Sequence, residues 1–371
     1  MKKTVLFFVL ATVVVLSIIT GCKHNSPSAP GATNTPNGTE TYIALYTHTI
    51  TPTHTVSPTI TATPTMTATS TVTQTYTSTI APTPIDYSVL VSVPGGTFTQ
   101  TDGTNSFSHT ISAFKMGKYQ VTYDLWYTVY TWAIANGYTF ANAGAEGNNG
   151  TLGTAPTTAK YQPVTTINWR DAIVWCNAYS QKSGLTPVYC SDASFNTPIK
   201  DSTNGSYGST TCTAAGCFDN PYVNWNTNGF RLPTEGEYQY AASYKDGTNW
   251  TPYSYASGAT ADYTNEAATD LVGWDYINSG STTHAVGGKI ANALGIYDMS
   301  GNVWELCWDW YGTYPTTIST DYRGPASGSN RVMRGGYCIN TAPALQVGYR
   351  YNVYNPYGAY YIGGFRFART Y

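Results

Sequence analysis

Charged residues are scarce in this chain: Asp, Glu, Lys and Arg make up 10% of its 371 residues, and the formal net charge is −2. Proteins that bind nucleic acid through its phosphates concentrate Lys and Arg on one face. A composition with so few basic residues does not supply such a face, so we expect no nucleic-acid partner.

Histidine is rare as well. Of the five histidines, three precede residue 87, which leaves His109 and His284 for the rest of the chain. Two histidines are too few for a His-rich zinc site, and a Ser-His-Asp triad would have to rest on one of them. Cys-x-x-Cys, His-Glu-x-x-His, phosphate-loop and Gly-x-Ser-x-Gly motifs are also absent. The sequence therefore does not favour a hydrolase.

The amino terminus has the pattern of an export signal. A basic start, Met1-Lys2-Lys3, precedes an almost unbroken apolar run over residues 4–19. The run ends in Ile19-Thr20-Gly21-Cys22, which resembles the bacterial lipobox, so we predict a signal peptide over residues 1–22 and lipidation of Cys22. The alternative is a signal anchor, for which the run is short. The chain is then an exported lipoprotein whose lipid anchor holds it in a membrane, at the outer membrane or cell surface.

Residues 23–86 are dominated by Thr, Pro, Ser and Ala. Such a segment has too few apolar residues to offset the entropy lost on ordering, so we expect a disordered stalk. Repeated proline favours an extended, semi-rigid spacer. The stalk would hold a domain spanning residues 87–371 away from the membrane.

Aromatic and turn-forming residues dominate that domain. The chain contains 33 Tyr, 10 Trp and 35 Gly, a mixture that suits short strands and long polar loops. Thr122 can cap a helix that runs to about Ala135, and Thr234 with Glu237 forms a capping box. We predict an α+β fold with few helices, short strands and high loop content. Further elements are expected as strands at 87–98, 114–122, 331–336 and 364–368 and as a helix whose buried stripe includes Ala172, Val174, Trp175, Ala178 and Tyr179.

The stretch from Gly295 to Gly312 holds three tryptophans, Trp304, Trp308 and Trp310. Tryptophan buries a large apolar area, so we place this stretch in the core. Asp298 and Glu305 flank its Gly-Asn turn and offer oxygens of the kind that calcium takes. The alternative is that both carboxylates only accept backbone amides within the turn.

Six of the seven cysteines lie in the domain. An exported chain permits disulfides. Cys212 and Cys217 are close enough in sequence to form a local bridge, and Cys190 could also join that loop. Cys176, on the second expected helix, and Cys307, in the Trp stretch, are expected to be buried thiols.

The order of several sequence blocks resembles one family. The blocks are Val93–Phe98, Lys118–Thr122, Pro163–Trp169, Gly229–Ala242, Gly295–Trp310, Arg334-Gly335-Gly336 and Gly364-Phe365-Arg366. Together they are similar to the sulfatase-modifying factor, or formylglycine-generating enzyme, domain family, whose fold is a variant of the C-type lectin fold. The resemblance covers residues 87–371.

The resemblance implies a test for catalysis. Oxidases of the family bind copper(I) through two cysteines shortly after the Arg-Gly-Gly block, and soft thiolates suit that ion. Asn340 and Leu345 occupy those two positions here, and Cys338 lies two residues early. We therefore expect no copper site. An oxidase of cysteine, or a divergent iron-dependent oxidase, is kept as the alternative function.

The calcium element of the family matches better. It implies Asp298 and Glu305 as side-chain ligands and the carbonyl groups of Gly301 and Val303 as further ligands, in a structural rather than catalytic site.

Tyrosine dominates the segment from Tyr337 to Ile362. This segment is similar to the variable proteins of diversity-generating retroelements, some of which are exported lipoproteins that display a C-terminal surface. We predict binding of a protein or glycan ligand there, because rigid aromatic side chains among Asn and Gly suit recognition. The alternative is that the tyrosines, which include Tyr351 and Tyr361, pack between loops. The expected ligand-binding residues are Tyr337, Cys338, Asn340, Leu345, Tyr349, Tyr354, Tyr357 and Tyr360.

Overall fold

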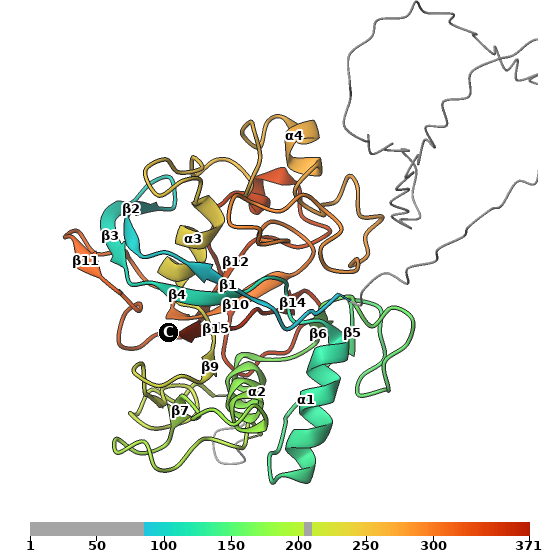
Figure 1. Cartoon of the computed structure of the whole chain (residues 1–371), viewed down its shortest axis with the longest axis vertical. Coiled ribbons are helices and arrows are strands. Elements are labelled where there is room, and N and C mark those ends of the chain that lie inside the picture. The colour runs from blue at the N-terminus through green and yellow to red at the C-terminus, as the bar shows by residue number, and fades with distance from the viewer. Residues whose placement is uncertain (1–84, 204–209) are drawn as a thin grey trace, which may run out of the picture. The chain divides into compact units, whose positions relative to one another are not determined.

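The computed structural model describes residues 85–203 and 210–371 (Figure 1). The predicted signal peptide, Cys22 and almost all of the stalk lie outside the described residues. Within the described part, no helix has the length and apolarity needed to cross a membrane.

Three helices begin at side-chain caps that can be located in the sequence. Thr122 Oγ1 accepts from the backbone N–H of Leu125 at the start of α1 (Tyr123–Ala135). Asn168 and Asp171 form a capping box at the start of α2 (Trp169–Lys182). Thr234 and Glu237 form the predicted capping box of α3 (Glu235–Ser243), which is confirmed. A short helix, α4 (Glu266–Asp270), and a 3₁₀ turn, η1 (Ala342–Leu345), complete the helical elements of the described residues.

The strands are short and form several small sheets. One sheet has the spatial order β1 (Leu90–Val93), β4 (Phe114–Gly117), β15 (Ala368–Thr370) and β9 (Phe230–Arg231). A second has the order β13 (Tyr351–Tyr354), β12 (Arg331–Arg334), β10 (Trp304–Trp310) and β14 (Gly363–Gly364). The smaller sheets are β11 (Ser319–Thr320) with β3 (Ser106–Ile111) and β2 (Gly96–Thr101), β5 (Ala145–Glu146) with β6 (Val164–Thr165), and β7 (Tyr189–Cys190) with β8 (Tyr222–Val223).

The single strand expected at 364–368 is wrong. The chain pairs with β10 at Gly363-Gly364 and then with β4 and β9 from Ala368 onward. Between these pairings Arg366 turns inward and binds both carboxylate oxygens of Glu305. The chain therefore crosses from one sheet to the other at this arginine.

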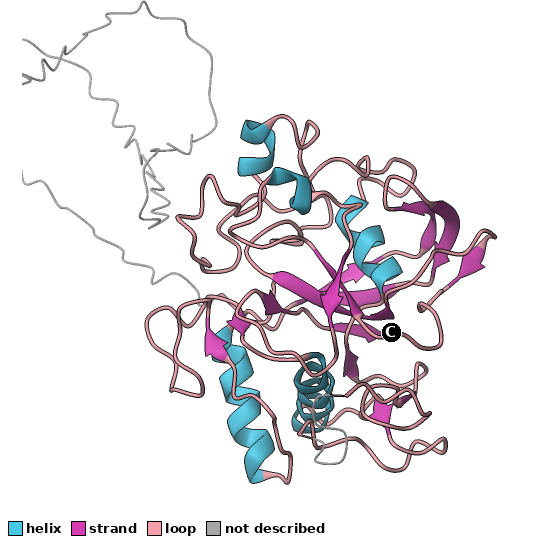
Figure 2. Cartoon of the chain, turned by 180° about the vertical axis from the view of Figure 1, so that it is seen from behind, coloured by secondary structure: helices cyan, strands magenta, loops and turns pink. Residues whose placement is uncertain are grey.

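Strand β10 lies at the centre of the domain, and all seven of its residues are buried. Trp308 contacts Trp169 of α2, with the ring centroids 5.5 Å apart. Trp126 of α1 stacks on Trp175 of α2 at 6.0 Å, and α1 and α2 lie side by side on one side of the central strands (Figures 1 and 2). Helix α3 lies on the other side. The predicted tryptophan core is confirmed, because Trp304 and Trp308 belong to the main buried cluster.

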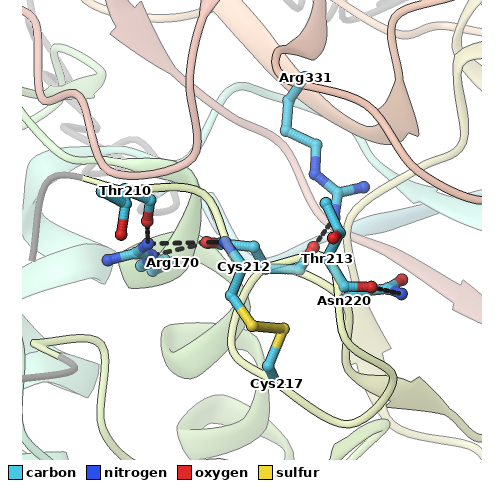
Figure 3. The surroundings of a disulfide bond; sticks show 8 residues. Arg170, Thr210, Cys212, Thr213, Cys217, Asn220 and Arg331 are labelled. Atoms are coloured by element: carbon cyan, nitrogen blue, oxygen red, sulfur yellow. Dashed lines mark hydrogen bonds and ion pairs between the residues drawn. A yellow bond between two sulfur atoms is a disulfide. The ribbon is translucent and has the colours of Figure 1, made fainter. Parts of the chain in front are cut away.

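Cys212 and Cys217 form a disulfide in the segment between β7 and β8 (Figure 3). Arg170 of α2 approaches the same segment through an ion pair with the buried Asp219, at 2.6 Å. The Asp219 carboxylate also accepts from the backbone N–H of Cys212 at 2.8 Å. The other cysteines of the described residues, which include Cys190, are buried free thiols.

Candidate functional site

The Tyr-rich segment leaves β12 at Gly335-Gly336 and first passes through the core. Tyr337, Cys338 and Leu345 are buried, with 2%, 0% and 0% of their surface exposed. Their assignment to a ligand-contacting surface is therefore corrected: Tyr337 and Cys338 belong to the main buried cluster, and Leu345 belongs to a smaller one. The alternative of packing between loops was stated for the tyrosines, and the burial of Tyr337 agrees with it.

A tight turn fixes the backbone of this region. The backbone N–H of Asn340 donates to the carbonyl of Tyr337 at 2.7 Å, and the backbone N–H of Tyr337 donates to Asn340 Oδ1 at 3.0 Å. Ser279 Oγ donates to the carbonyl of Cys338 at 2.5 Å. Asn340, itself half-buried, thus holds the turn in place by its hydrogen bonds.

Exposed aromatic and aliphatic side chains lie on this turn and on two segments that contact it. The loop after α4 joins it through the backbone N–H of Tyr276, which donates to the carbonyl of Asn340 at 2.9 Å. The ring of Tyr361 meets that of the buried Tyr337 edge-on, with the centroids 6.2 Å apart. We use the name tyrosine-isoleucine surface for five side chains that are each 38–56% exposed: Tyr276, Ile277, Ile339, Tyr360 and Tyr361.

The remaining predicted residues lie apart from one another. Tyr349 is 39% exposed, and its ring lies 5.8 Å from that of Trp304. Tyr357 is half-buried, with the guanidinium of Arg170 over its ring at 5.6 Å. Tyr354 belongs to β13, but its side chain lies outside what the structure describes. Of the predicted set, only Tyr360 belongs to the tyrosine-isoleucine surface.

Sequence reasoning missed Tyr276, Ile277 and Ile339. No local pattern marks Tyr276 and Ile277 as site residues. The backbone hydrogen bond from Tyr276 to Asn340, which is far along the chain, brings their segment to the turn. Tyr361 was visible as part of the Tyr-rich segment but was not selected as a site residue.

The two copper positions carry no thiolate. Asn340 Oδ1 already accepts from a backbone N–H, and Leu345 packs beneath Gly336. Burial raises the pKa of the Cys338 thiol to about 12, so this lone thiol stays protonated near neutral pH. Among the described residues, no group of three His, Cys, Asp or Glu side chains could hold a metal ion. These residues do not fit copper(I).

Three of the four predicted calcium-ligand atoms come together: the carbonyl oxygens of Gly301 and Val303 and a carboxylate oxygen of Glu305. At Asp298 the backbone carbonyl joins them, and the predicted side chain does not. The carbonyl oxygens of Asp298, Gly301 and Val303 and Oε1 of Glu305 all lie 3.1–3.3 Å from one atom, the side-chain nitrogen Nε2 of Gln120. We call these four atoms the oxygen ring. A Cβ at Gly301, where φ is +85°, would lie 2.2 Å from the Trp274 carbonyl oxygen, so this turn requires glycine.

The two carboxylates of this turn differ in their partners. Glu305 is fully buried and receives Nε and Nη2 of Arg366 at 2.6 and 2.7 Å. Asp298 accepts the backbone N–H of Gly287 through Oδ2 at 2.7 Å, whereas its Oδ1 is buried without a hydrogen-bond partner. Burial raises the pKa of the Asp298 carboxyl to about 6.

The described residues form an α+β domain with few helices, short strands and a tryptophan-centred core. The comparisons with known proteins agree with this class. Residues 77–371 match the model of the sulfatase-modifying factor enzyme 1-like domain. The chain belongs to that family, and the predicted formylglycine-generating-enzyme-like fold is confirmed.

Three relatives differ in how much of each chain they share. The chain is 31% identical over 272 residues to the chaperone protein LppX of Paenibacillus barcinonensis, which covers 70% of this chain and 82% of the relative. It resembles the structure of Treponema denticola variable protein 1 with a TM-score of 0.60 and 30% identity, over 76% of this chain and 95% of the other. It is 31% identical to the formylglycine-generating enzyme of Streptomyces coelicolor, but over only 31% of this chain and 37% of the enzyme.

Proposed function

We propose that this protein is a surface-anchored lipoprotein whose domain binds a protein or glycan ligand through the tyrosine-isoleucine surface. The observation that carries the proposal is that five exposed apolar or aromatic side chains lie on a turn fixed by internal hydrogen bonds and on the two segments that contact it. Aromatic side chains on a rigid support contribute contact area at low entropic cost. The likeness to a protein described as variable, over most of both chains, also supports a display role.

In this proposal the lipid on Cys22 anchors the protein in a membrane. The export signal and the Thr/Pro-rich segment support it, since they would place the domain outside the cytoplasm at some distance from a bilayer.

Alanine substitution tests the binding surface. The full chain is screened on a glycan array and on an array of extracellular proteins, and the affinity of the strongest ligand is then measured for Tyr276→Ala, Ile339→Ala and Tyr361→Ala. We expect at least one of the three to lower affinity by about tenfold or more, as buried anchors of an interface do.

Tyr371→Ala and Ile318→Ala are matched controls, because these side chains are 61% and 77% exposed and lie outside the surface. The controls should bind within about twofold of the parent chain, as surface positions outside an interface do. Equal losses in controls and surface variants, or no loss in any surface variant, would place the ligand elsewhere.

A second candidate function is assistance to the folding of an exported protein. It is supported by the similarity to LppX, which is described as a chaperone and is covered over 82% of its length. A chaperone would use the same exposed apolar side chains against unfolded chains rather than against one folded ligand. Suppression of the aggregation of a reductively unfolded model protein, lost in Ile339→Ala and Tyr361→Ala but kept in Ile318→Ala, would favour this function over specific recognition.

A further inference from the structure

The side-chain nitrogen of Gln120 occupies the middle of the oxygen ring. Gln120 lies in the segment between β4 and α1, and the ring belongs to the turn before β10, so residues about 180 positions apart meet here. All four ring oxygens are 3.1–3.3 Å from Gln120 Nε2. A cation that used these oxygens would have to occupy nearly the same point as this nitrogen, because Ca²⁺ lies about 2.3–2.6 Å from each of its ligands.

The hydrogen-bond network fixes which end of the Gln120 amide faces the ring. Asn302 Oδ1 accepts the backbone N–H of His284 at 2.9 Å, and Asn302 Nδ2 donates to the His284 carbonyl at 3.1 Å. These two bonds to backbone groups set the orientation of the Asn302 amide, since a backbone N–H can only donate and a carbonyl can only accept.

Asn302 therefore presents a donor to Gln120. Its Nδ2 donates to Gln120 Oε1 at 3.0 Å, so Oε1 faces Asn302 and Nε2 faces the ring. Turning the Gln120 amide over would place two NH₂ groups against each other and an oxygen among four oxygens. Gln120 and Asn302 are both buried, so water does not relieve such a conflict.

The charge of the ring is also balanced without a metal. Its one carboxylate, Glu305, is paired with Arg366 through both oxygens, and Arg366 Nη2 donates in addition to the carbonyl of Asp298 at 3.2 Å. One oxygen remains that a cation would bind and that Gln120 does not contact, namely the buried Oδ1 of Asp298.

We propose that the side-chain amide of Gln120, oriented by Asn302, takes the place of the calcium ion expected at Asp298, Gly301, Val303 and Glu305. The turn that leads into β10 is then held by hydrogen bonds and the Arg366–Glu305 ion pair, and the domain folds without metal. This inference does not depend on the ligand-binding function proposed above.

The parent chain gives the first test. Its thermal unfolding midpoint is measured with 1 mM CaCl₂, with 1 mM MgCl₂ and with chelator. We expect midpoints within about 1 °C of one another and much less than one calcium per chain by elemental analysis. A bound cation whose concentration is 100 times its Kd would raise the midpoint by roughly 5 °C in a domain of this size. Such a shift, seen with calcium and not with magnesium, would overturn the proposal.

Two variants are expected to create the calcium site that the parent chain lacks. Gln120→Ala removes the amide and leaves four oxygens around an open centre. Asn302→Asp replaces the donor that faces Gln120 with an acceptor, so the Gln120 amide should turn over and add its oxygen to the ring. Each variant should unfold at a lower temperature in chelator than the parent chain and regain roughly 5 °C or more in 1 mM CaCl₂.

Gln239→Ala and Asn292→Asp are matched controls, because both are buried amides outside the ring that donate to backbone carbonyls. They should be destabilised without any recovery in calcium. If both ring variants also fail to recover in calcium, the amide does not stand in for a cation and the proposal is overturned. If a ring variant is recovered folded only when calcium is present during refolding, the proposal is supported.

Discussion

Single buried polar residues determine how the stability of this domain changes with pH. His109 in β3 has none of its surface exposed. Its Nδ1 lies 2.6 Å from Gln100 Oε1, and its Nε2 accepts the backbone N–H of Tyr322 at 2.8 Å. This pattern requires the neutral ring with the proton on Nδ1. Burial lowers the pKa of His109 to about 4, although the nearby carboxylates of Asp321, Glu237 and Glu235 oppose the shift.

The lowered pKa of His109 predicts a loss of stability in acid. Above pH 6.5 the ring is neutral in both the folded and the unfolded chain, so it makes no difference. As the pH falls from 6.5 to 4, the unfolded chain binds a proton that the folded chain does not, and unfolding becomes more favourable by up to roughly 3 kcal/mol. His109→Gln keeps an acceptor for Tyr322 and does not titrate.

Urea denaturation from pH 7 to pH 4 should therefore show a smaller loss for His109→Gln than for the parent chain. Titration of the carboxylates changes the stability of both proteins. The difference between their two slopes of unfolding free energy against pH therefore isolates the contribution of His109. Parallel slopes would mean that His109 is protonated in the folded domain.

Among the elements, helix α3 shows how a local signal and a distant partner combine. The Thr234–Glu237 capping box was predicted because its two residues are three positions apart and the side chain of each bonds to the backbone of the other. The partner of Glu237 was not predicted. Arg231 of β9 donates to both oxygens of Glu237 at 2.7 Å, and the pair is almost fully buried.

Substitutions in this box should differ in cost. Thr234→Ala removes one cap hydrogen bond and should lower the free energy of unfolding by about 1 kcal/mol. Glu237→Ala also leaves the Arg231 guanidinium buried without its counter-charge, and should cost roughly 3–5 kcal/mol. Chemical denaturation of the two variants measures both values, and Thr122→Ala at the cap of α1 serves as a second cap without an ion pair. Equal costs for Thr234→Ala and Glu237→Ala would show that the ion pair contributes nothing net.

The distance in sequence between interacting residues also explains which parts of the fold and of the site could be predicted from the sequence. The helix caps at Thr122 and Thr234, the tryptophan-rich stretch at 304–310 and the local disulfide depend on residues close in sequence, and they were predicted. The crossing of the chain between two sheets at Arg366 depends on Glu305, and it was missed. Tyr276 and Gln120 were missed for the same reason, because each reaches its site across a long stretch of chain.

At the scale of the whole molecule, the proposed function gives the domain and its lipid anchor separate roles. The family scaffold provides a buried core and an edge of loops, and the loops carry the tyrosine-isoleucine surface. After the apolar run at 4–19, residues 23–86 are dominated by Thr, Pro, Ser and Ala, a composition that supplies few residues to such a core. Removal of the anchor should therefore change where the domain is found and leave its thermal unfolding midpoint unchanged.

Cys22→Ala tests this separation directly. Cells that express the full chain are labelled with a palmitate analogue and extracted with a detergent that separates into two phases. The parent chain should carry label and enter the detergent phase, whereas Cys22→Ala should do neither, because a lipid anchor contributes binding energy for every methylene that it buries. Ser26→Ala, a few residues further along, is the matched control and should behave as the parent chain does. An unlabelled parent chain in the aqueous phase would mean that residues 1–22 act as an ordinary signal peptide, and an unlabelled parent chain in the detergent phase would mean that they act as a signal anchor. Label that persists on Cys22→Ala would place the lipid at another residue. Each of these results contradicts an anchor at Cys22.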